Sequence, residues 1–358
     1  MDHQLRRTKL SPRLPDLEVD ALLVSRLPNV RYLTGFTGSN AQALLTADGE
    51  GSVFLTDGRY TEQSRHEVPD MRRETYLGDF PSMFAQACKD AAVTRVGFET
   101  AGLTYRLWEQ LSATEDVTLV PVRDEIELLR WVKDPQEIEL LNRAQAITDE
   151  AFERIQTKLV EGITERDLAL ELEWALRQSG AEALSFETIL AFGESAAEPH
   201  HHPSARELRQ GDVVKFDFGA LYGGYHADMT RTIAFGEPPA EIREIHQLVA
   251  AAQQAGFDAV RAGVSGREAD AASRKVIADA GRGEAFSHSL GHGVGLEIHE
   301  GPTLRTSSDD VLPVGAVVTV EPGVYVPGLG GVRIEDMVEV TEEGCRVLGT
   351  STRELVVV

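Results

Sequence analysis

The sequence predicts two domains: an α/β domain, followed by an α+β domain that contains an internal repeat. Two observations support this prediction. In the first third of the chain, short apolar segments typical of strands alternate with segments typical of helices, and in the rest two pairs of glycine-containing motifs recur at nearly the same spacing. A length of 358 residues agrees with two domains at about 150 residues each.

The first domain is predicted from apolar runs bounded by turn residues. Ala21–Val24 predicts a buried strand, and Ala41–Leu45 and Ser52–Leu55 flank the turn Ala47–Glu50, which is typical of a β-hairpin. The remaining elements expected in this domain are helices at 59–67 and 81–92 and a short strand at Arg95–Phe98.

A strong helix start opens the second domain. Asp134 is a good N-cap residue, Pro135 suits the first helical position, and Glu137 completes the pattern of a capping box. Apolar residues then recur at helical spacing from Ile138 onwards. We therefore assign residues 1–127 to the first domain and residues 128–358 to the second.

The second domain repeats a helix–helix–strands unit. Gly162–Asp167 resembles Gly263–Glu268, 101 residues later, and Gly180 and Gly281 follow the next helix at the same offset. The two further matching segments share the pattern G-x-V-V-x-x-acid-x-G and lie 104 residues apart, at Gly211–Gly219 and Gly315–Gly323. Matching order, spacing and acid position indicate two copies of one unit packed together.

Composition excludes several classes of function. The formal net charge of −23 disfavours nucleic acid, whose phosphates would be repelled. The two cysteines, Cys88 and Cys345, form neither a disulfide framework nor a thiolate zinc motif. The polar start has no signal-peptide pattern, and no apolar run is long enough to span a membrane. We expect a cytoplasmic protein without membrane contact.

One acid stands in an apolar strand of each repeat. Asp217 lies in VVKFDFG and Glu321 lies in VVTVEPG. Burying an unpaired carboxylate costs several kcal/mol, so each acid needs a hydrogen-bond partner, a cation or a metal ion. A structural ion pair with Lys215 or Arg333 stays open as the alternative.

Each repeat also carries a second acid shortly downstream. Asp228 follows Asp217 by eleven positions, and Glu335 follows Glu321 by fourteen, which is the spacing of residues facing each other across a hairpin. Four carboxylates then converge from two related hairpins and require cations. Oxygen ligands suit divalent ions such as Mn²⁺, and an added imidazole favours transition metals.

Histidines cluster in two segments. His288, His292 and His299 lie in the glycine-rich SHSLGHGVGLEIHEGP, which lacks the spacing and the lysine of a phosphate-binding loop. His200, His201 and His202 are adjacent in sequence. Three adjacent histidines more often belong to a solvated loop than act as three ligands. We therefore expect at most one or two of them to have a role in the site.

These motifs resemble the creatinase/prolidase/methionine-aminopeptidase family, which has the pita-bread fold, and within it the proline-specific branch of aminopeptidase P and prolidase. RLPNVRYLTGFTGS at Arg26–Ser39 and DGRY at Asp57–Tyr60 resemble the N-terminal domain of that family. The resemblance implies a creatinase-like N-terminal domain over 1–127 and a pita-bread metallopeptidase domain over 128–358. It also implies a homodimer or a higher homo-oligomer.

The resemblance implies a role for each candidate site residue. It implies two divalent metal ions, with Mn²⁺ preferred over Co²⁺, Zn²⁺ or Fe²⁺. The implied metal ligands are Asp217, Asp228, His292, Glu321 and Glu335, the implied catalytic residues are His200, His299 and Glu321, and the implied substrate-binding residues are His288, Tyr325 and Arg333. His201, His202 and His226 are expected to be bystanders, and Tyr325 and Arg333 are expected to have a structural role more than a chemical one.

The implied activity is hydrolysis of the bond between a first residue and a following proline. Asp228 and Glu335 would bridge the ions, His299 would stabilise the oxyanion, Glu321 would carry a proton to the leaving nitrogen, and His200 would lie near that nitrogen. A non-catalytic peptide-binding or chaperone-like protein of the same fold is the alternative of another class. The presence of all five ligand types argues against it.

The sequence favours an aminopeptidase P over the alternative, an Xaa-Pro dipeptidase (prolidase). The short path from Phe192 to His200 leaves no long insertion to roof the pocket, and no second basic cluster is evident to hold a free proline carboxylate. An open site of this kind should accept Xaa-Pro-Yaa at least as well as Xaa-Pro.

Overall fold

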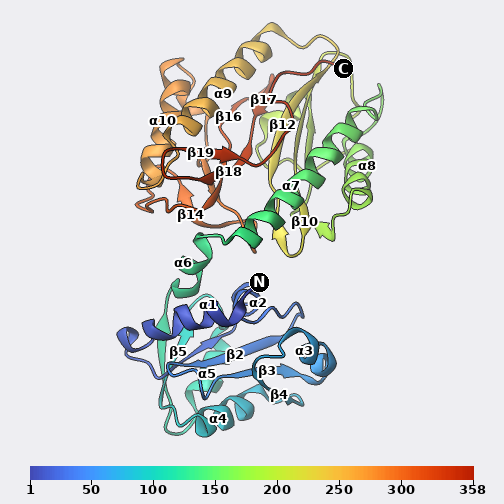
Figure 1. Ribbon diagram of the computed structural model, residues 1–358. Helices are drawn as coiled ribbons and strands as arrows, with labels where there is room; N and C mark the ends of the chain where they lie inside the picture. Colours follow the sequence, from blue (N-terminus) through green and yellow to red (C-terminus); the bar gives the residue numbers. More distant parts are fainter. The chain divides into compact units, whose positions relative to one another are not determined.

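The computed structural model describes all 358 residues, and the chain divides into two compact units, Met1–Arg130 and Trp131–Val358 (Figure 1). None of the helices combines the length and the apolar character needed to cross a membrane.

The first unit is built on one six-stranded sheet. The strands lie in the order β4-β3-β2-β1-β5-β6, and β1, β2 and β3 pair antiparallel whereas the outer pairings are parallel. The predicted hairpin is therefore confirmed, with Ala41 opposite Thr56. The strands are β1 (Ala21–Val24), β2 (Ala41–Thr46), β3 (Val53–Asp57), β4 (Arg72–Tyr76), β5 (Arg95–Glu99) and β6 (Thr118–Val122).

Helices cover the sheet of the first unit. Phe84 of α4 and Leu111 of α5 belong to one buried cluster with Leu23 and Leu55 of the sheet. Helices α1 and α2 lie on the side of the sheet opposite α4 (Figure 1). The helices are α1 (His3–Leu10), α2 (Leu27–Thr34), α3 (Thr61–Glu67), α4 (Phe80–Asp90), α5 (Tyr105–Ser112) and α6 (Glu125–Trp131), which continues to the boundary of the second unit.

The second unit consists of two halves, each with its own buried core. In the first half, helices α7 and α8 pack on the sheet β12-β9-β8, and a short sheet β11-β10-β7 lies beside it. The elements of this half are α7 (Pro135–Gln156), α8 (Glu165–Gln178), β7 (Ala183–Leu184), β8 (Ile189–Phe192), β9 (Asp212–Phe218), β10 (Ala220–Tyr222), β11 (Tyr225–His226) and β12 (Met229–Phe235).

In the second half, helices α9 and α10 pack on the five-stranded sheet β14-β13-β15-β18-β19, and β16 and β17 form a separate ribbon. Figure 1 shows α7 and α8 outside one half and α9 and α10 outside the other. The elements are α9 (Ala240–Ala259), α10 (Gly266–Asp279), β13 (Gly291–Gly293), β14 (Glu300–Leu304), β15 (Val317–Val320), β16 (Gly323–Val326), β17 (Gly330–Arg333), β18 (Asp336–Val340) and β19 (Cys345–Val347).

The predicted internal repeat is confirmed in the local geometry of the two halves. Thr164 caps α8 and Ser265 caps α10, each through its side-chain oxygen. Gly180 and Gly281, which follow these helices, both have positive φ angles, of 108° and 76°. The two halves therefore start and stop their second helix by the same means.

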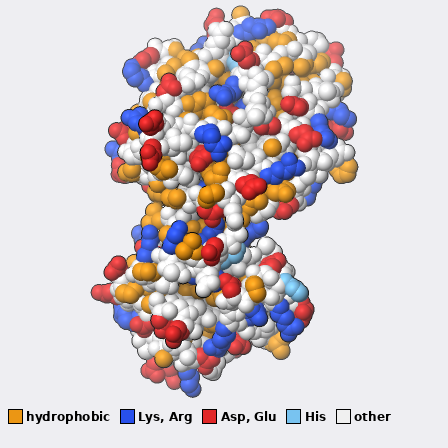
Figure 2. Space-filling view, viewed as in Figure 1, with side chains coloured by type: hydrophobic (Ala, Val, Ile, Leu, Met, Phe, Trp, Pro, Cys, Tyr) orange, Lys and Arg blue, Asp and Glu red, His pale blue; other side chains and the backbone are white.

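Acidic and basic side chains are interspersed on the face of the molecule in Figure 2, and no continuous basic area is seen on that face.

The capping box predicted at the start of α7 is present. Asp134 accepts hydrogen bonds from the backbone of Gln136 and Glu137, each at 2.9 Å, and Glu137 bonds back to the Asp134 nitrogen. We predict that Asp134→Ala lowers the free energy of unfolding by about 1 kcal/mol, because backbone donors at the helix start lose their acceptor. Urea denaturation followed by circular dichroism measures this change, and Asp134→Asn, which keeps an acceptor, should retain most of the stability.

Candidate active site

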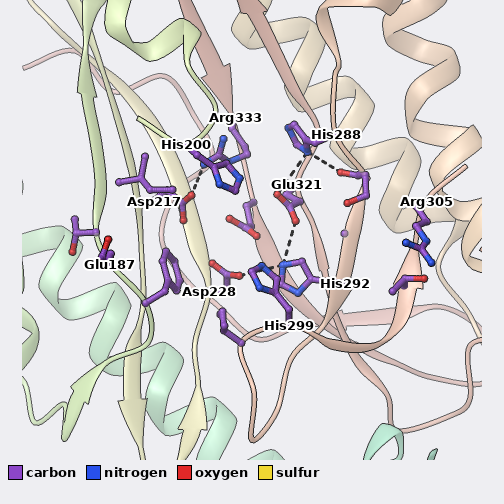
Figure 3. Close-up of a pocket in the computed structure, with 18 of the residues that line it drawn as sticks. Glu187, His200, Asp217, Asp228, His288, His292, His299, Arg305, Glu321 and Arg333 are labelled. Carbon is purple, nitrogen blue, oxygen red and sulfur yellow. Dashed lines mark hydrogen bonds and ion pairs between the residues drawn. The ribbon is translucent and has the colours of Figure 1, made fainter. Parts of the chain in front are cut away.

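A cavity of about 510 Å³ in the second unit brings together most of the candidate site residues. Both halves of the repeat contribute to its wall. The charged and histidine residues that line it are Glu187, His200, His202, Asp217, Asp228, His288, His292, His299, Arg305, Glu321, Arg333 and Glu335, and Figure 3 shows their arrangement.

The four acids lie where strands of the two halves end or begin. Asp217 is in β9 and Asp228 directly precedes β12, whereas Glu321 directly follows β15 and Glu335 precedes β18. The paired strands run antiparallel, as expected for hairpins. Each hairpin is longer than the sequence suggested, because β10 and β11 extend the first connection, and β16 and β17 extend the second.

Glycines let β13 approach its neighbours closely. A Cβ atom at Gly291 would collide with the Thr319 carbonyl, and one at Gly293 would collide with the Gly301 carbonyl. His292 lies between these glycines, and its backbone nitrogen donates to Thr319 Oγ1 at 3.1 Å. The close pairing of strands therefore brings the imidazole beside the acids that flank β15 and β18.

Burial and mutual repulsion raise the pKa values of three of these acids. Burial is the main cause for Asp228 and Glu321, and the neighbouring Glu335 carboxylate adds to it, so both pKa values lie well above the usual range. Burial, followed by the charge of Asp217, raises the pKa of Glu335 to about 8. Carboxylates with these pKa values are ionised together near neutral pH only when cations lie among them.

One guanidinium partly balances the cluster. Arg333 Nη2 forms an ion pair with Asp217, and Arg333 Nε donates to Thr230 Oγ1 at 2.9 Å. Thr230 Oγ1 in turn donates to Glu335 Oε2 at 2.6 Å. Burial opposes the charge of Arg333, but Tyr325 and Asp217 raise its pKa well above its usual value. A single positive charge cannot neutralise four carboxylates.

The geometry of His292 fits a metal ligand. Its Nδ1 lies 3.1 Å from the Gly293 carbonyl, which can only accept, so Nδ1 carries the hydrogen. Burial, followed by His299, lowers the pKa of His292 to about 4, so the ring is neutral. The Nε2 lone pair then faces oxygens of Asp228 and Glu321 at 3.5 and 3.4 Å. Lone pairs facing each other at these distances require a cation between them.

Ligand atoms of Asp228, His292 and Glu335 all lie within 4.8 Å of one another. Carboxylate oxygens combined with one imidazole are a donor set for a divalent transition metal. The residues present therefore fit divalent metal ions.

The other candidate histidines surround this centre. The ring of His299 packs edge-on against His292, with centroids 4.3 Å apart. His288 Nδ1 donates to the Ser289 carbonyl at 2.8 Å, and burial, followed by Arg333, lowers the pKa of His288 to about 3. His288 Nε2 therefore accepts from Tyr325 Oη at 2.8 Å. His200 is exposed on the cavity wall.

Tyr325 differs from the other candidates because it does not line the cavity. It is 7% exposed, and its hydroxyl accepts a hydrogen bond from Arg333 Nη1 at 2.7 Å while it donates to His288. Tyr325 thus supports the cavity wall from behind, through its hydrogen bonds to Arg333 and His288.

Two charged residues that sequence reasoning missed line the same cavity. Arg305 and Glu187 form no ion pair with any residue, and Figure 3 places them on opposite sides of the acid cluster. Neither belongs to a recognisable motif, so the sequence alone offered no signal for them. His202, expected to be a bystander, also lines the cavity.

Lys215 and His201 also have partners that the sequence did not indicate. Lys215 forms no ion pair with Asp217, and its Nζ atom donates to backbone carbonyls near His200 instead. His201 Nε2 lies 2.8 Å from Glu165 Oε2, and its Nδ1 lies 2.7 Å from Glu198 Oε2, so it connects two acids outside the metal cluster.

Comparison with known proteins identifies both units. Residues 139–342 match the model of metallopeptidase family M24, and residues 6–132 match the creatinase/prolidase N-terminal domain. The chain belongs to metallopeptidase family M24. The resemblance to the pita-bread family and the expected fold class are thus confirmed, and the protein is a metal-dependent hydrolase.

Several relatives of this M24 peptidase are similar over their whole length. An Xaa-Pro dipeptidase from Bacillus anthracis has a structure with a TM-score of 0.96 and 39% identity, covering 99% of this chain and 100% of the other. An X-Pro aminopeptidase structure from Thermotoga maritima has a TM-score of 0.90 and 37% identity, covering 97% and 100%. An Xaa-Pro dipeptidase from Pyrococcus horikoshii is 35% identical, covering 94% and 95%.

We predict that Asp228→Ala and Glu335→Ala each reduce the amount of bound metal, because each removes an oxygen from the three-residue group that can hold an ion. Metal analysis of the dialysed protein after loading with Mn²⁺ measures the effect. Glu187→Gln is the matched control, because Glu187 lines the cavity but lies outside the acid cluster, and it should keep the metal content of the unmodified protein. Full metal content in Asp228→Ala or Glu335→Ala would contradict the ligand assignment.

Proposed function

We propose that this protein is an Xaa-Pro dipeptidase that uses two divalent metal ions, preferably Mn²⁺, to hydrolyse the bond between a first residue and a C-terminal proline. The observation that carries the proposal is Arg305, a guanidinium without an acidic partner on the wall of the cavity that holds the acid cluster. A dipeptide presents a free carboxylate one residue beyond the bond to be cleaved, and arginine recognises carboxylates well.

This proposal takes the alternative that the sequence placed second. The preference for an aminopeptidase P rested on an open pocket and on the absence of a basic cluster to hold a proline carboxylate, and we assign that role to Arg305 on the cavity wall. The names of the relatives from Bacillus anthracis and Pyrococcus horikoshii support the dipeptidase as well. The name of the Thermotoga maritima relative keeps the aminopeptidase as the second candidate.

Five residues would hold the metal ions: Asp217, Asp228, His292, Glu321 and Glu335. Two such ions, when bound, would supply Lewis acidity for the scissile carbonyl and would lower the pKa of the water that serves as the nucleophile. The acids provide the negative charge that these ions require, and Arg333 keeps Asp217 oriented through their ion pair. The hydrogen on His292 Nδ1 is held by the Gly293 carbonyl, so Nε2 stays free to act as a ligand.

The remaining residues carry out proton transfer and charge stabilisation. Glu321 accepts a proton from the attacking water and passes it to the leaving nitrogen. His299 donates a hydrogen bond to the carbonyl oxygen as negative charge develops on it. The nitrogen of an Xaa-Pro bond carries no hydrogen, so proline cannot leave until that nitrogen is protonated. His200, exposed on the cavity wall, is assigned to the leaving side, near this nitrogen.

We predict that the protein loaded with Mn²⁺ cleaves a dipeptide such as Leu-Pro with a higher kcat/KM than Leu-Pro-Gly. Arg305→Ala should lower kcat/KM for Leu-Pro by about 10-fold or more, the scale of a hydrogen bond between charged groups. The same substitution should change cleavage of Leu-Pro-Gly much less, because its proline has no free carboxylate. Release of leucine, measured by chromatography at one Mn²⁺ concentration, gives both constants.

Three results would redirect the assignment. Faster cleavage of Leu-Pro-Gly than of Leu-Pro would identify an aminopeptidase. Release of methionine from a Met-Ala-Yaa peptide in preference to both would indicate a methionine aminopeptidase. No cleavage of any peptide by metal-loaded protein would favour the non-catalytic alternative.

We predict that His299→Ala keeps its metal ions and lowers kcat by about 10²–10³-fold, the effect of removing one donor to an oxyanion. His299 packs against His292 but is not among the three residues whose ligand atoms lie within 4.8 Å of one another. Metal analysis and steady-state kinetics on the same preparation separate the two effects. Loss of metal in this variant would show that His299 is a ligand.

A further inference from the structure

Lys215 is the one lysine in the strand that carries Asp217, and its side chain is fully buried. Its Nζ atom lies 3.1 Å from the Ala196 carbonyl, 2.5 Å from the Glu198 carbonyl and 3.3 Å from the Pro199 carbonyl. The three carbonyl oxygens can accept hydrogen bonds from Nζ, which carries two N–H donors as an amine and three as an ammonium group. The lysine thus binds the backbone of the segment that ends at Pro199, immediately before His200.

Lys215 and Asp217 lie on the same face of β9, because side chains two apart in a strand point the same way. Strand β9 therefore fixes the position of Asp217 in the acid cluster. Through Lys215, the same strand also fixes the segment that precedes His200. If Lys215 only filled space in the core, three carbonyl oxygens would not need to surround its Nζ atom. The Tyr325 ring, with its centroid 5.3 Å from Nζ, closes the remaining side.

His200 depends on this backbone for its position. Its ring forms no hydrogen bond or ion pair with any residue, and the side chain is exposed. On its other side, His201 binds Glu165 at the start of α8, and it also binds the Glu198 side chain of the preceding segment. Apart from Lys215, only Arg333 Nη1 reaches a carbonyl of the preceding segment, at 3.3 Å from Pro199 O.

We propose that Lys215 is a positioning residue that holds the backbone of 196–199 so that the exposed ring of His200 stands at the leaving side of the scissile bond. This inference rests on the proposed function for the role of His200, but the placement of the segment by Lys215 does not. Misplacing a catalytic group by about 1 Å costs up to about 10²-fold in rate, so the expected effect is on kcat.

Lys215→Met tests the proposal, because methionine has a similar length and no donor. We expect hydrogen–deuterium exchange of the peptide covering 194–204 to become at least about 10-fold faster, since the tether of this segment is lost. We expect kcat for Leu-Pro to fall about 10- to 100-fold with unchanged metal content and a smaller change in KM. Lys215→Met/His200→Ala should be no slower than His200→Ala alone, because both changes remove the same contribution.

The matched control is Asp149→Asn. Asp149 is also buried, and it tethers another segment by accepting from the Thr350 nitrogen at 2.8 Å and Ser351 Oγ at 2.7 Å, outside the cavity. This variant should change neither kcat nor exchange of 194–204. Lys215→Gln, which keeps an amide donor, gives an intermediate effect and replaces Lys215→Met if that variant does not fold.

Each contrary result has a distinct meaning. Unchanged exchange of 194–204 in Lys215→Met, or an additive loss of rate in the double variant, would overturn the proposal. Loss of metal in Lys215→Met would also overturn it, because Lys215 would then support Asp217 rather than His200. If the unmodified enzyme cleaves no Xaa-Pro peptide, the proposed function fails, and the exchange measurement still decides whether Lys215 holds the segment.

Discussion

Four carboxylates converge in one buried cavity of the second unit and repel one another. The surrounding structure must hold them in place against this repulsion. Leaving a charged group buried without a partner costs several kcal/mol, and the raised pKa values of Asp228, Glu321 and Glu335 reflect this cost. A fold that keeps such a cluster needs rigid elements that prevent the acids from moving apart. Here each acid stands at or beside a strand whose partner strand fixes its position.

Arg333 connects this cluster to the residues assigned to chemistry. Its guanidinium binds Asp217 on one side, Tyr325 Oη on another and the Pro199 carbonyl on a third. The Tyr325 hydroxyl donates in turn to His288 Nε2, which links Arg333 to that histidine. A planar group with five donors in fixed directions can orient several acceptors at once and in a defined geometry. The charge balance of the acids and the geometry of the cavity wall therefore depend on the same side chain.

The sequence predicted those parts of the molecule that repeat or that form apolar runs. The four acids were found because each stands in or near an apolar strand of a duplicated motif, where a carboxylate is conspicuous. Strands β4 and β6 were missed because they are edge strands, largely exposed, and carry polar residues and Pro121 instead of an apolar run. Arg305 and the partners of Lys215 were missed because they depend on where loops and side chains point in three dimensions.

The internal repeat explains why the acids occur in two similar pairs. It does not explain how the site distinguishes the two ends of a peptide. Two similar halves supply two similar pairs of carboxylates, whereas a peptide has an amino end and a carboxyl end. The differences between the halves provide the direction. Only the second half places a histidine, His292, among the acids, and only it carries Arg305, whereas Glu187 and His200 come from the first half. Because Glu187 and Arg305 lie on opposite sides of the acids, the cavity carries opposite charges on its two sides (Figure 3). The duplicated strands thus place the acids, and the residues that differ between the halves make the two sides of the cavity different in charge.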